Sequence, residues 1–159
     1  MASKYYIAYG SNLSVEQMKQ RTPDAVIVGT GILHGWRLLF RQFATIQEDK
    51  NFDVPVLVWK ISAQDEKNLD RYEGFPRFYR KKNLSVHVKS LDGEDLGELT
   101  AMVYVMTSKA VNDRFANPLP SDYYYSILDK GYETFGFDKK ILEGALIELY
   151  ETFTFVFGS

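Results

Sequence analysis

A short stretch near the N-terminus combines residue types that could hold negative charge. Tyr5–Tyr9 is rich in aromatic and β-branched residues, which favour a strand, and Gly10 can turn the backbone sharply after it. Ser14 and Gln17 have the spacing of a capping box, which predicts that a helix begins there. These elements would leave unpaired backbone N–H groups that can bind a carboxylate, a phosphate or an oxyanion. The same pattern also occurs in plain connecting turns, so alone it does not identify a site.

Glu73 is the acidic residue whose predicted surroundings best suit proton transfer. It lies at the predicted C-terminal end of a helix, where the helix dipole disfavours negative charge. Tyr72, Phe75 and Phe78 flank it and could remove water from its carboxyl group. Both effects would raise the pKa of Glu73 towards neutrality and prepare it as a general base or acid. The alternative is an exposed glutamate beside a turn.

Other common catalytic and cofactor motifs are missing from the sequence. There is no Gly-x-Ser-x-Gly elbow, no Lys-bearing phosphate loop and no His-Glu-x-x-His. The chain has no cysteine, and His34 and His87 stand alone. Gly29, Gly31 and Gly35 do not have the spacing of a dinucleotide fingerprint. We therefore expect neither a metal nor a cofactor.

Four motifs, in order along the chain, resemble segments of the γ-glutamylcyclotransferase family. They are Tyr9–Leu13 (Tyr-Gly-Ser-Asn-Leu), Leu69–Phe75, Ala101–Thr107 and Pro120–Tyr124, and the resemblance extends from Tyr5 to about Phe137. One step departs from the family pattern. Gln42 and Phe43 precede Ala44-Thr45-Ile46, where relatives often carry a Gly-Gly step. The larger residues would fill space near the expected pocket, so the identity of the substrate stays open.

The resemblance implies an enzyme that releases 5-oxoproline and a free amine from a γ-glutamyl substrate, with Glu73 as general base and acid. The implied substrate-binding residues are Tyr9, Gly10, Ser11, Asn12, Leu13, Tyr79, Tyr104 and Tyr124. The backbone N–H groups of residues 10–13 would hold either the α-carboxylate or the developing oxyanion. The tyrosines would donate hydrogen bonds or simply fill the core. The departing amine could belong to an α-amino acid, to a lysine side chain, to another amine or to a γ-glutamyl antibiotic precursor.

Two other functions are compatible with the residues. The same pocket could bind a small acidic metabolite without turning it over. The run Arg77–Lys82 is basic and aromatic, as on some nucleic-acid surfaces, but the formal net charge of −2 argues against a nucleic-acid partner. These charges more simply lie on the solvated face of a strand, from which Arg77 or Arg80 could still reach a substrate carboxylate.

The hydrophobic pattern predicts the elements that must position these residues. Strands are expected at 5–9, 25–28, 32–40, 54–61, 79–89 and 99–107, and a further one at 153–157. Helices are expected at 15–19, 62–72, 124–135 and 138–149. Gly29–Gly31 is expected to be a turn, Gln47–Asn51 a polar connector and Asp92–Gly93 a hairpin turn. The pattern therefore predicts one mixed α+β domain over residues 1–159, and the resemblance implies a curled sheet or barrel of about five to seven strands with helices outside.

Composition and hydropathy limit the setting in which the protein works. A chain of 159 residues can bury a core without disulfides, and the absence of cysteine fits a reducing cytoplasm. No apolar run approaches the roughly 20 residues that span a bilayer, so no membrane partner is expected. Met1–Lys4 leads directly into the first strand, which predicts that no signal peptide is present. The aromatic stretch Phe153–Phe157 is expected to pack on the body or to form a homodimer contact.

Overall fold

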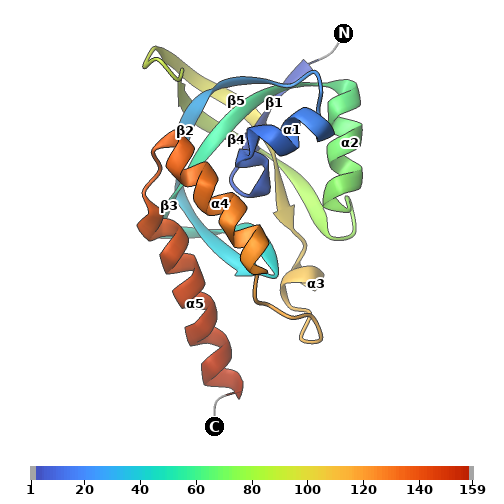
Figure 1. Ribbon diagram of the computed structural model, residues 1–159, viewed down its shortest axis with the longest axis vertical. Coiled ribbons are helices and arrows are strands. Elements are labelled where there is room, and N and C mark those ends of the chain that lie inside the picture. The colour runs from blue at the N-terminus through green and yellow to red at the C-terminus, as the bar shows by residue number, and fades with distance from the viewer. Residues whose placement is uncertain (1–2, 158–159) are drawn as a thin grey trace.

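The computed structural model describes residues 3–157, which form a closed five-stranded barrel with helices on its outside (Figure 1). The strands are β1 (Ser3–Ala8), β2 (Val26–Arg41), β3 (Phe43–Ser62), β4 (Tyr79–Lys89) and β5 (Asp95–Met106). The helices are η1 (Ser11–Leu13), α1 (Val15–Arg21), α2 (Ala63–Glu73), α3 (Ser108–Val111), α4 (Asp122–Phe135) and α5 (Lys139–Phe157). No helix in this part of the chain is both long and apolar enough to cross a membrane. The predicted α+β class and the barrel are confirmed.

The barrel closes in the order β1-β3-β2-β4-β5, and β1 pairs with β5 to complete it. All neighbouring strands are antiparallel except this last pair, in which Tyr6 lies opposite Met102. The predicted strand 54–61 lies in β3, between β1 and β2, and residues 54–59 are all buried. Along β4, Val86 and Val88 are buried while Ser85 and His87 are exposed, as the alternating pattern predicts.

Gly29 and Gly31 lie inside β2, so the predicted turn at this point is wrong. Here β2 pairs with β4, and Gly31 lies opposite Val88. A Cβ atom on Gly29 would lie 2.0 Å from the carbonyl oxygen of Lys89, and one on Gly31 would lie 2.6 Å from that of His87. The two glycines therefore allow the backbones of β2 and β4 to approach closely where the barrel closes.

Gln47–Asn51 is also part of a strand, so the predicted connector is wrong as well. The true connection between β2 and β3 is a tight turn at Gln42, which has a φ of 69°. Between Trp36 paired with Glu48 and His34 paired with Asp53, residues 49–52 lie opposite the single residue 35. This bulge places the polar residues on the exposed part of a long hairpin, which explains their composition.

The C-terminal helix is longer than the sequence pattern predicts. Asp138 accepts a hydrogen bond from the backbone N–H of Lys140 at 3.0 Å and marks the start of α5. The helix then continues to Phe157, so the strand predicted at Phe153–Phe157 is wrong. Neither glycine nor proline interrupts the chain between Ala145 and Phe157. The established helix therefore continues through residues whose own propensity favours a strand.

Candidate functional site

The loop after β1 is fixed from three sides. The indole N–H of Trp59 on β3 donates to the backbone carbonyl of Asn12 at 3.1 Å. The N–H of Leu13 donates to the carbonyl of Gly10 at 3.0 Å and closes the single turn of η1. A Cβ atom on Gly131 of α4 would lie 2.6 Å from the Cβ of Leu13, so only a glycine lets this helix pack so closely on the loop. These contacts hold Ser11 and Asn12 in place at one end of the barrel.

Helix α2 ends at the predicted catalytic acid. Ser62 and Asp65 form a complete capping box at its start. At its other end Gly74 adopts the left-handed conformation, with φ 66°, and the N–H of Phe75 donates to the carbonyl of Asp70 at 2.9 Å. Glu73 is therefore the last helical residue, which confirms the helix predicted from the sequence.

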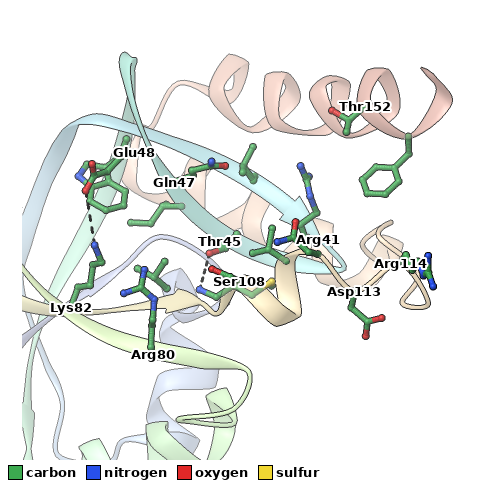
Figure 2. Close-up of a pocket in the computed structure, with 18 residues that line it drawn as sticks. Arg41, Thr45, Gln47, Glu48, Arg80, Lys82, Ser108, Asp113, Arg114 and Thr152 are labelled. Atoms are coloured by element: carbon green, nitrogen blue, oxygen red, sulfur yellow. Dashed lines mark hydrogen bonds and ion pairs between the residues drawn. The ribbon is translucent and has the colours of Figure 1, made fainter. Parts of the chain in front are cut away.

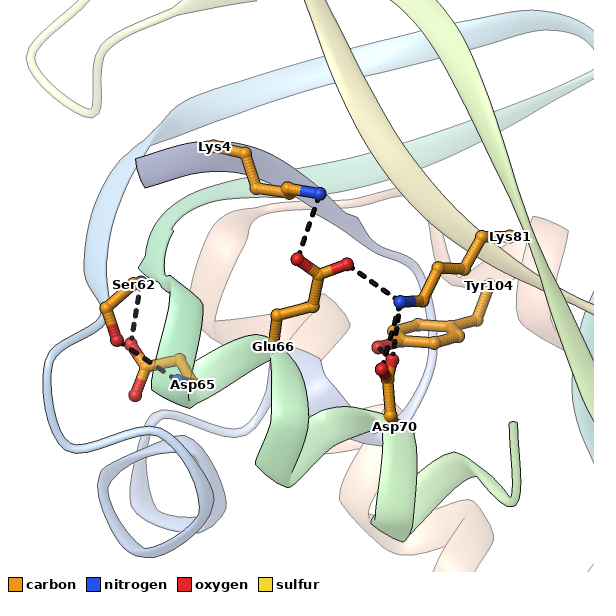
Figure 3. A network of polar contacts seen from close by, with 7 residues as sticks. All are labelled: Lys4, Ser62, Asp65, Glu66, Asp70, Lys81 and Tyr104. Atoms are coloured by element: carbon orange, nitrogen blue, oxygen red, sulfur yellow. Dashed lines mark hydrogen bonds and ion pairs between the residues drawn. The ribbon is translucent and has the colours of Figure 1, made fainter. Parts of the chain in front are cut away.

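Asp70 fixes this last turn of α2 to the barrel (Figure 3). Its carboxylate accepts a hydrogen bond from the hydroxyl of Tyr104 on β5 at 2.5 Å and pairs with the ammonium of Lys81 on β4 at 2.8 Å. Lys81 also pairs with Glu66 at 2.7 Å, and Lys4 pairs with the other oxygen of Glu66 at 2.9 Å. Charges from β1, β4 and α2 are thus linked, and the network sets the position of Glu73 one helical turn beyond Asp70.

The Glu73 carboxyl group faces the loop after β1. The side-chain amide of Asn12 donates to Glu73 Oε1 at 3.5 Å and to the hydroxyl of Tyr6 at 2.8 Å. Arg21, in the last turn of α1, donates to Asn12 Oδ1 at 2.6 Å, and its guanidinium lies 3.4 Å from the ring centroid of Tyr72. The contact of Arg21 leaves both amide hydrogens of Asn12 for Tyr6 and Glu73. The structure thereby brings the loop and the acid together.

Burial raises the pKa of Glu73 from its ordinary value of 4.5 to about 7, and the positive charge of Arg21 opposes part of that rise. Of the three flanking aromatic residues, Tyr72 and Phe78 line a pocket that opens beside Glu73. Phe75 is 38% exposed and does not line this pocket. A carboxyl group with this pKa can both accept and donate a proton near neutral pH.

A cavity of about 30 Å³ lies directly beside Glu73. Its lining residues come from β1, the following loop, β3, α2, β4, β5 and α4, and are Tyr6, Tyr9, Gly10, Ser11, Asn12, Ala44, Glu73, Tyr79, Tyr104 and Tyr124. Seven of the eight predicted substrate-binding residues lie among them. Leu13 does not, because its side chain is buried against Gly131 and its N–H is used within η1.

The tyrosine hydroxyls of this cavity differ in the hydrogen bonds that they have available. Tyr9 and Tyr79 donate to the backbone carbonyls of Tyr104 and Ala44 at 2.6 and 2.7 Å, and Tyr104 donates to Asp70. The Tyr124 hydroxyl instead accepts from the N–H of Ala44 at 3.0 Å, as the Tyr6 hydroxyl accepts from Asn12. In the part of the chain that the structure describes, neither of these two hydroxyls donates to another group. Their hydrogens are available to a ligand.

A larger pocket of about 290 Å³ opens next to this cavity. It is lined by Ser11, Phe43, Arg71, Tyr72, Glu73, Gly74, Phe78, Tyr79 and Tyr124, and four of these residues also line the inner cavity. We call the two spaces the inner cavity and the outer pocket. Phe43, one of the two residues that depart from the family pattern, therefore lines the outer pocket, as its position in the sequence predicts.

A cavity of about 620 Å³, larger than the inner cavity and the outer pocket, lies elsewhere (Figure 2). It runs between β3, β4, α3 and α5, where Arg41 forms two hydrogen bonds with Glu148 and Lys82 lies near Glu48. Its acids Glu48 and Asp113 are exposed, and neither Glu73 nor any tyrosine lines it. We therefore place the candidate site at the inner cavity, where the half-buried Glu73 faces hydrogen-bond donors. Size alone is a poorer criterion than this chemistry.

Two expectations about charged residues change in the structure. Arg80 lines the cavity of about 620 Å³, and neither Arg77 nor Arg80 lines the inner cavity or the outer pocket. Arg21 and Arg71 are the basic residues at the site, and the sequence interpretation did not select them. Residues 3–157 contain no group of three or more His, Cys, Asp or Glu side chains that could hold a metal ion.

Known proteins similar in sequence belong to one family. A family model described as gamma-glutamyl cyclotransferase, AIG2-like, matches residues 6–125. The bovine gamma-glutamylcyclotransferase is 27% identical over 139 residues, which cover 79% of this chain and 68% of the bovine protein. The human protein of the same name is 28% identical over 138 residues, with the same shares of the two chains.

Solved structures share the fold. One described as gamma-glutamyl cyclotransferase matches with a TM-score of 0.72 and 26% identity, over 91% of this chain and 86% of its own. The structure of a yeast gamma-glutamyl cyclotransferase specific to glutathione matches with a TM-score of 0.60 and 14% identity, over 91% and 96% of the two chains.

Proposed function

The chain belongs to the gamma-glutamyl cyclotransferase, AIG2-like family, and we propose that it releases 5-oxoproline and a free amine from a small γ-glutamyl substrate, with Glu73 as general base and then acid. The observation that supports this most strongly is the half-buried Glu73 carboxyl group, with a pKa raised to about 7, beside the Asn12 amide and the loop at Gly10–Leu13.

The proposed reaction needs no water and no covalent intermediate. The α-amine of the glutamyl group attacks its own side-chain carbonyl carbon, so a C–N bond forms and closes a five-membered lactam. The Glu73 carboxylate accepts a proton from the α-ammonium group, which leaves the neutral amine that attacks. The same carboxyl group then donates that proton to the departing nitrogen as the original amide C–N bond breaks. The ring nitrogen also loses its second proton to the departing nitrogen, which therefore leaves as an ammonium. Because the two reacting groups belong to one molecule, holding it folded supplies much of the acceleration.

The pKa of Glu73 suits both proton transfers. A free α-amine has a pKa of about 8, and the carboxyl group has a pKa of about 7. The transfer from the amine to the carboxylate is therefore nearly balanced, and so is the return of the proton to the leaving group. A solvated glutamate would be a weaker base by more than two pKa units.

Hydrogen-bond donors around the inner cavity would hold the negative charges of the substrate. The backbone N–H groups of Ser11 and Asn12 and the free hydroxyl hydrogens of Tyr6 and Tyr124 are the donors that we assign to this role. They would bind the α-carboxylate or the oxygen that becomes negative in the tetrahedral intermediate. The inner cavity has room for about one water molecule, so the rest of the substrate must extend into the outer pocket.

The test is incubation of the purified protein with γ-glutamyl-alanine, followed by chromatographic measurement of 5-oxoproline and alanine. We expect both products in equal amounts from the wild-type protein and a loss of at least about 1000-fold in kcat for Glu73→Gln, because the amide cannot accept the proton. Glu94→Gln, at an exposed acid in the turn before β5, is the matched control and should keep full activity.

The same materials test the second candidate function, a binding module for a small acidic metabolite. If calorimetry shows that the wild-type protein binds γ-glutamyl-alanine while neither this compound nor any other γ-glutamyl amide tested yields 5-oxoproline, the binding module is correct and the enzymatic proposal is wrong. If Glu73→Gln retains the wild-type rate, the role of Glu73 is wrong.

A further inference from the structure

The outer pocket adjoins the reacting centre and is the space that a departing amine would occupy. It shares Ser11, Glu73, Tyr79 and Tyr124 with the inner cavity. A substrate whose scissile carbonyl lies beside Glu73 would therefore extend its leaving group into the outer pocket. The question is which chemical class of leaving group this pocket fits. Its shape and charge narrow the choice.

The wall of the outer pocket consists of interlocking aromatic rings. Phe43 packs edge-on against Tyr124, with ring centroids 5.3 Å apart, and against Phe78 at 6.1 Å. Phe78 in turn contacts Tyr79 at 5.3 Å. These rings come from β3, α4, β4 and the segment before β4, so the wall joins parts of the chain that are distant in sequence. Such a wall favours an apolar side chain over a polar one.

Charge distinguishes an acidic leaving group from a basic one. Arg71 is the basic residue among those lining the outer pocket, and Glu73 is the acidic one, already assigned to proton transfer. The Tyr72 ring, which could otherwise attract a cation, already has the Arg21 guanidinium over it at 3.4 Å. The pocket therefore offers a partner for a carboxylate and none for a second ammonium group.

We propose, on the basis of the proposed function, that the leaving group is an α-amino acid with a large apolar or aromatic side chain, joined to the glutamyl group through its α-amine. Its side chain packs against Phe43 and Phe78, and its α-carboxylate faces Arg71. A polyamine would instead carry a positive charge towards Arg71, and a lysine joined through its side-chain amine would place a long chain with a zwitterionic end in the pocket and no apolar side chain against Phe43 and Phe78.

The experiment compares kcat/KM for four substrates, with 5-oxoproline as the readout. They are γ-glutamyl-phenylalanine, γ-glutamyl-alanine, γ-glutamyl-phenethylamine and Nε-(γ-glutamyl)-lysine. We expect γ-glutamyl-phenylalanine to exceed γ-glutamyl-alanine by about 10- to 100-fold, which is the range expected when a phenyl group is buried. It should also exceed the lysine derivative.

Variants test separately whether the aromatic wall and the charge of Arg71 cause this substrate preference. Phe43→Ala should reduce the preference for phenylalanine over alanine to within about threefold, and Phe43→Leu should give an intermediate ratio. Phe115→Ala, at a ring that is 87% exposed and outside the pocket, is the control and should leave the ratio unchanged. Arg71→Gln should lower kcat/KM for γ-glutamyl-phenylalanine by about tenfold but not for γ-glutamyl-phenethylamine, which lacks the carboxylate.

The results separate failure of this inference from failure of the proposed function. If γ-glutamyl-alanine is converted and γ-glutamyl-phenylalanine is no better, or if the lysine derivative is preferred, the assignment of the leaving group is wrong while the reaction stands. If Phe43→Ala and Phe43→Leu both keep the full preference, the aromatic wall does not select the substrate. If none of the four compounds yields 5-oxoproline, the proposed function fails and this inference fails with it.

Discussion

Replacing Glu73, the proposed catalytic acid, should make the protein more stable, and by an amount that depends on pH. Burial raises the pKa of Glu73 from 4.5 to about 7 because the folded protein disfavours the charged form. The folded state therefore binds this proton more tightly than the unfolded chain does. The stabilisation is fully present below about pH 4.5 and is lost as the pH rises through about 7.

The pKa shift of Glu73 determines how much Glu73→Gln should stabilise the protein. One pKa unit corresponds to about 1.4 kcal/mol, so a rise from 4.5 to about 7 corresponds to about 3 kcal/mol once the group is ionised. Glutamine has nearly the same shape and stays neutral, so Glu73→Gln removes this cost. The gain should grow from about 1 kcal/mol at about pH 5 to about 3 kcal/mol at about pH 8. For a chain of this length the corresponding rise in Tm is about 5 to 10 °C.

Urea unfolding of the wild-type protein and Glu73→Gln, followed by tryptophan fluorescence at several pH values, measures the difference directly. Comparing the two proteins at each pH cancels every other titrating group that they share. Glu94→Gln serves as the control, because an exposed carboxyl group should give a difference that hardly varies with pH. A constant difference between wild type and Glu73→Gln across this range would show that Glu73 is not strained by burial, and the argument for its role would be refuted.

Other consequences follow from the same geometry. Arg21→Gln should move the acidic limb of the pH profile of kcat/KM to higher pH, because Arg21 lowers the pKa of Glu73; a limb that stays or moves down contradicts this. Tyr124→Phe should reduce kcat/KM by about 100-fold with the fold intact by circular dichroism, because it removes one donor; a change below threefold would exclude Tyr124 from charge stabilisation. Gly31→Ala should destabilise the barrel by at least about 2 kcal/mol in urea, whereas Gly144→Ala, with open space around it in α5, should stabilise it by up to about 1 kcal/mol; similar effects at both would refute the close-approach explanation.

Local signals in the sequence predict the elements that hold the site. The capping residues Ser14 and Ser62, and the left-handed glycines Gly74 and Gly136, mark helix ends that the structure confirms. Such signals act within one turn of chain, so a single sequence contains them in full. The position of Glu73 as the last residue of α2 follows from them directly.

The errors in the predicted elements have a different cause, since they depend on contacts distant in sequence. Gly29 and Gly31 have the composition of a turn, and only the crossing of β4 shows that they allow two backbones to approach. The polar residues 47–51 resemble a connector, and only the pairing with β2 makes them a strand. Residues 153–157 alternate as a strand does, yet they extend a helix that was already formed. In each case tertiary structure overrides a weak local preference.

Glu73 shows most clearly what cannot be predicted from the sequence alone. Its pKa depends on burial by residues from six other parts of the chain and on the opposing charge of Arg21, which reaches the site from the end of α1 through Asn12. Of its three aromatic neighbours in sequence, Phe75 does not enclose it, because Phe75 lies 38% exposed and outside both cavities. If burial acted alone, the carboxyl group would be protonated over more of the physiological range and would be a poorer acceptor for the α-amine proton. The positive charge of Arg21 opposes this effect and favours the carboxylate, so the proposed proton transfer would depend on α1 as well as on the helix that carries Glu73.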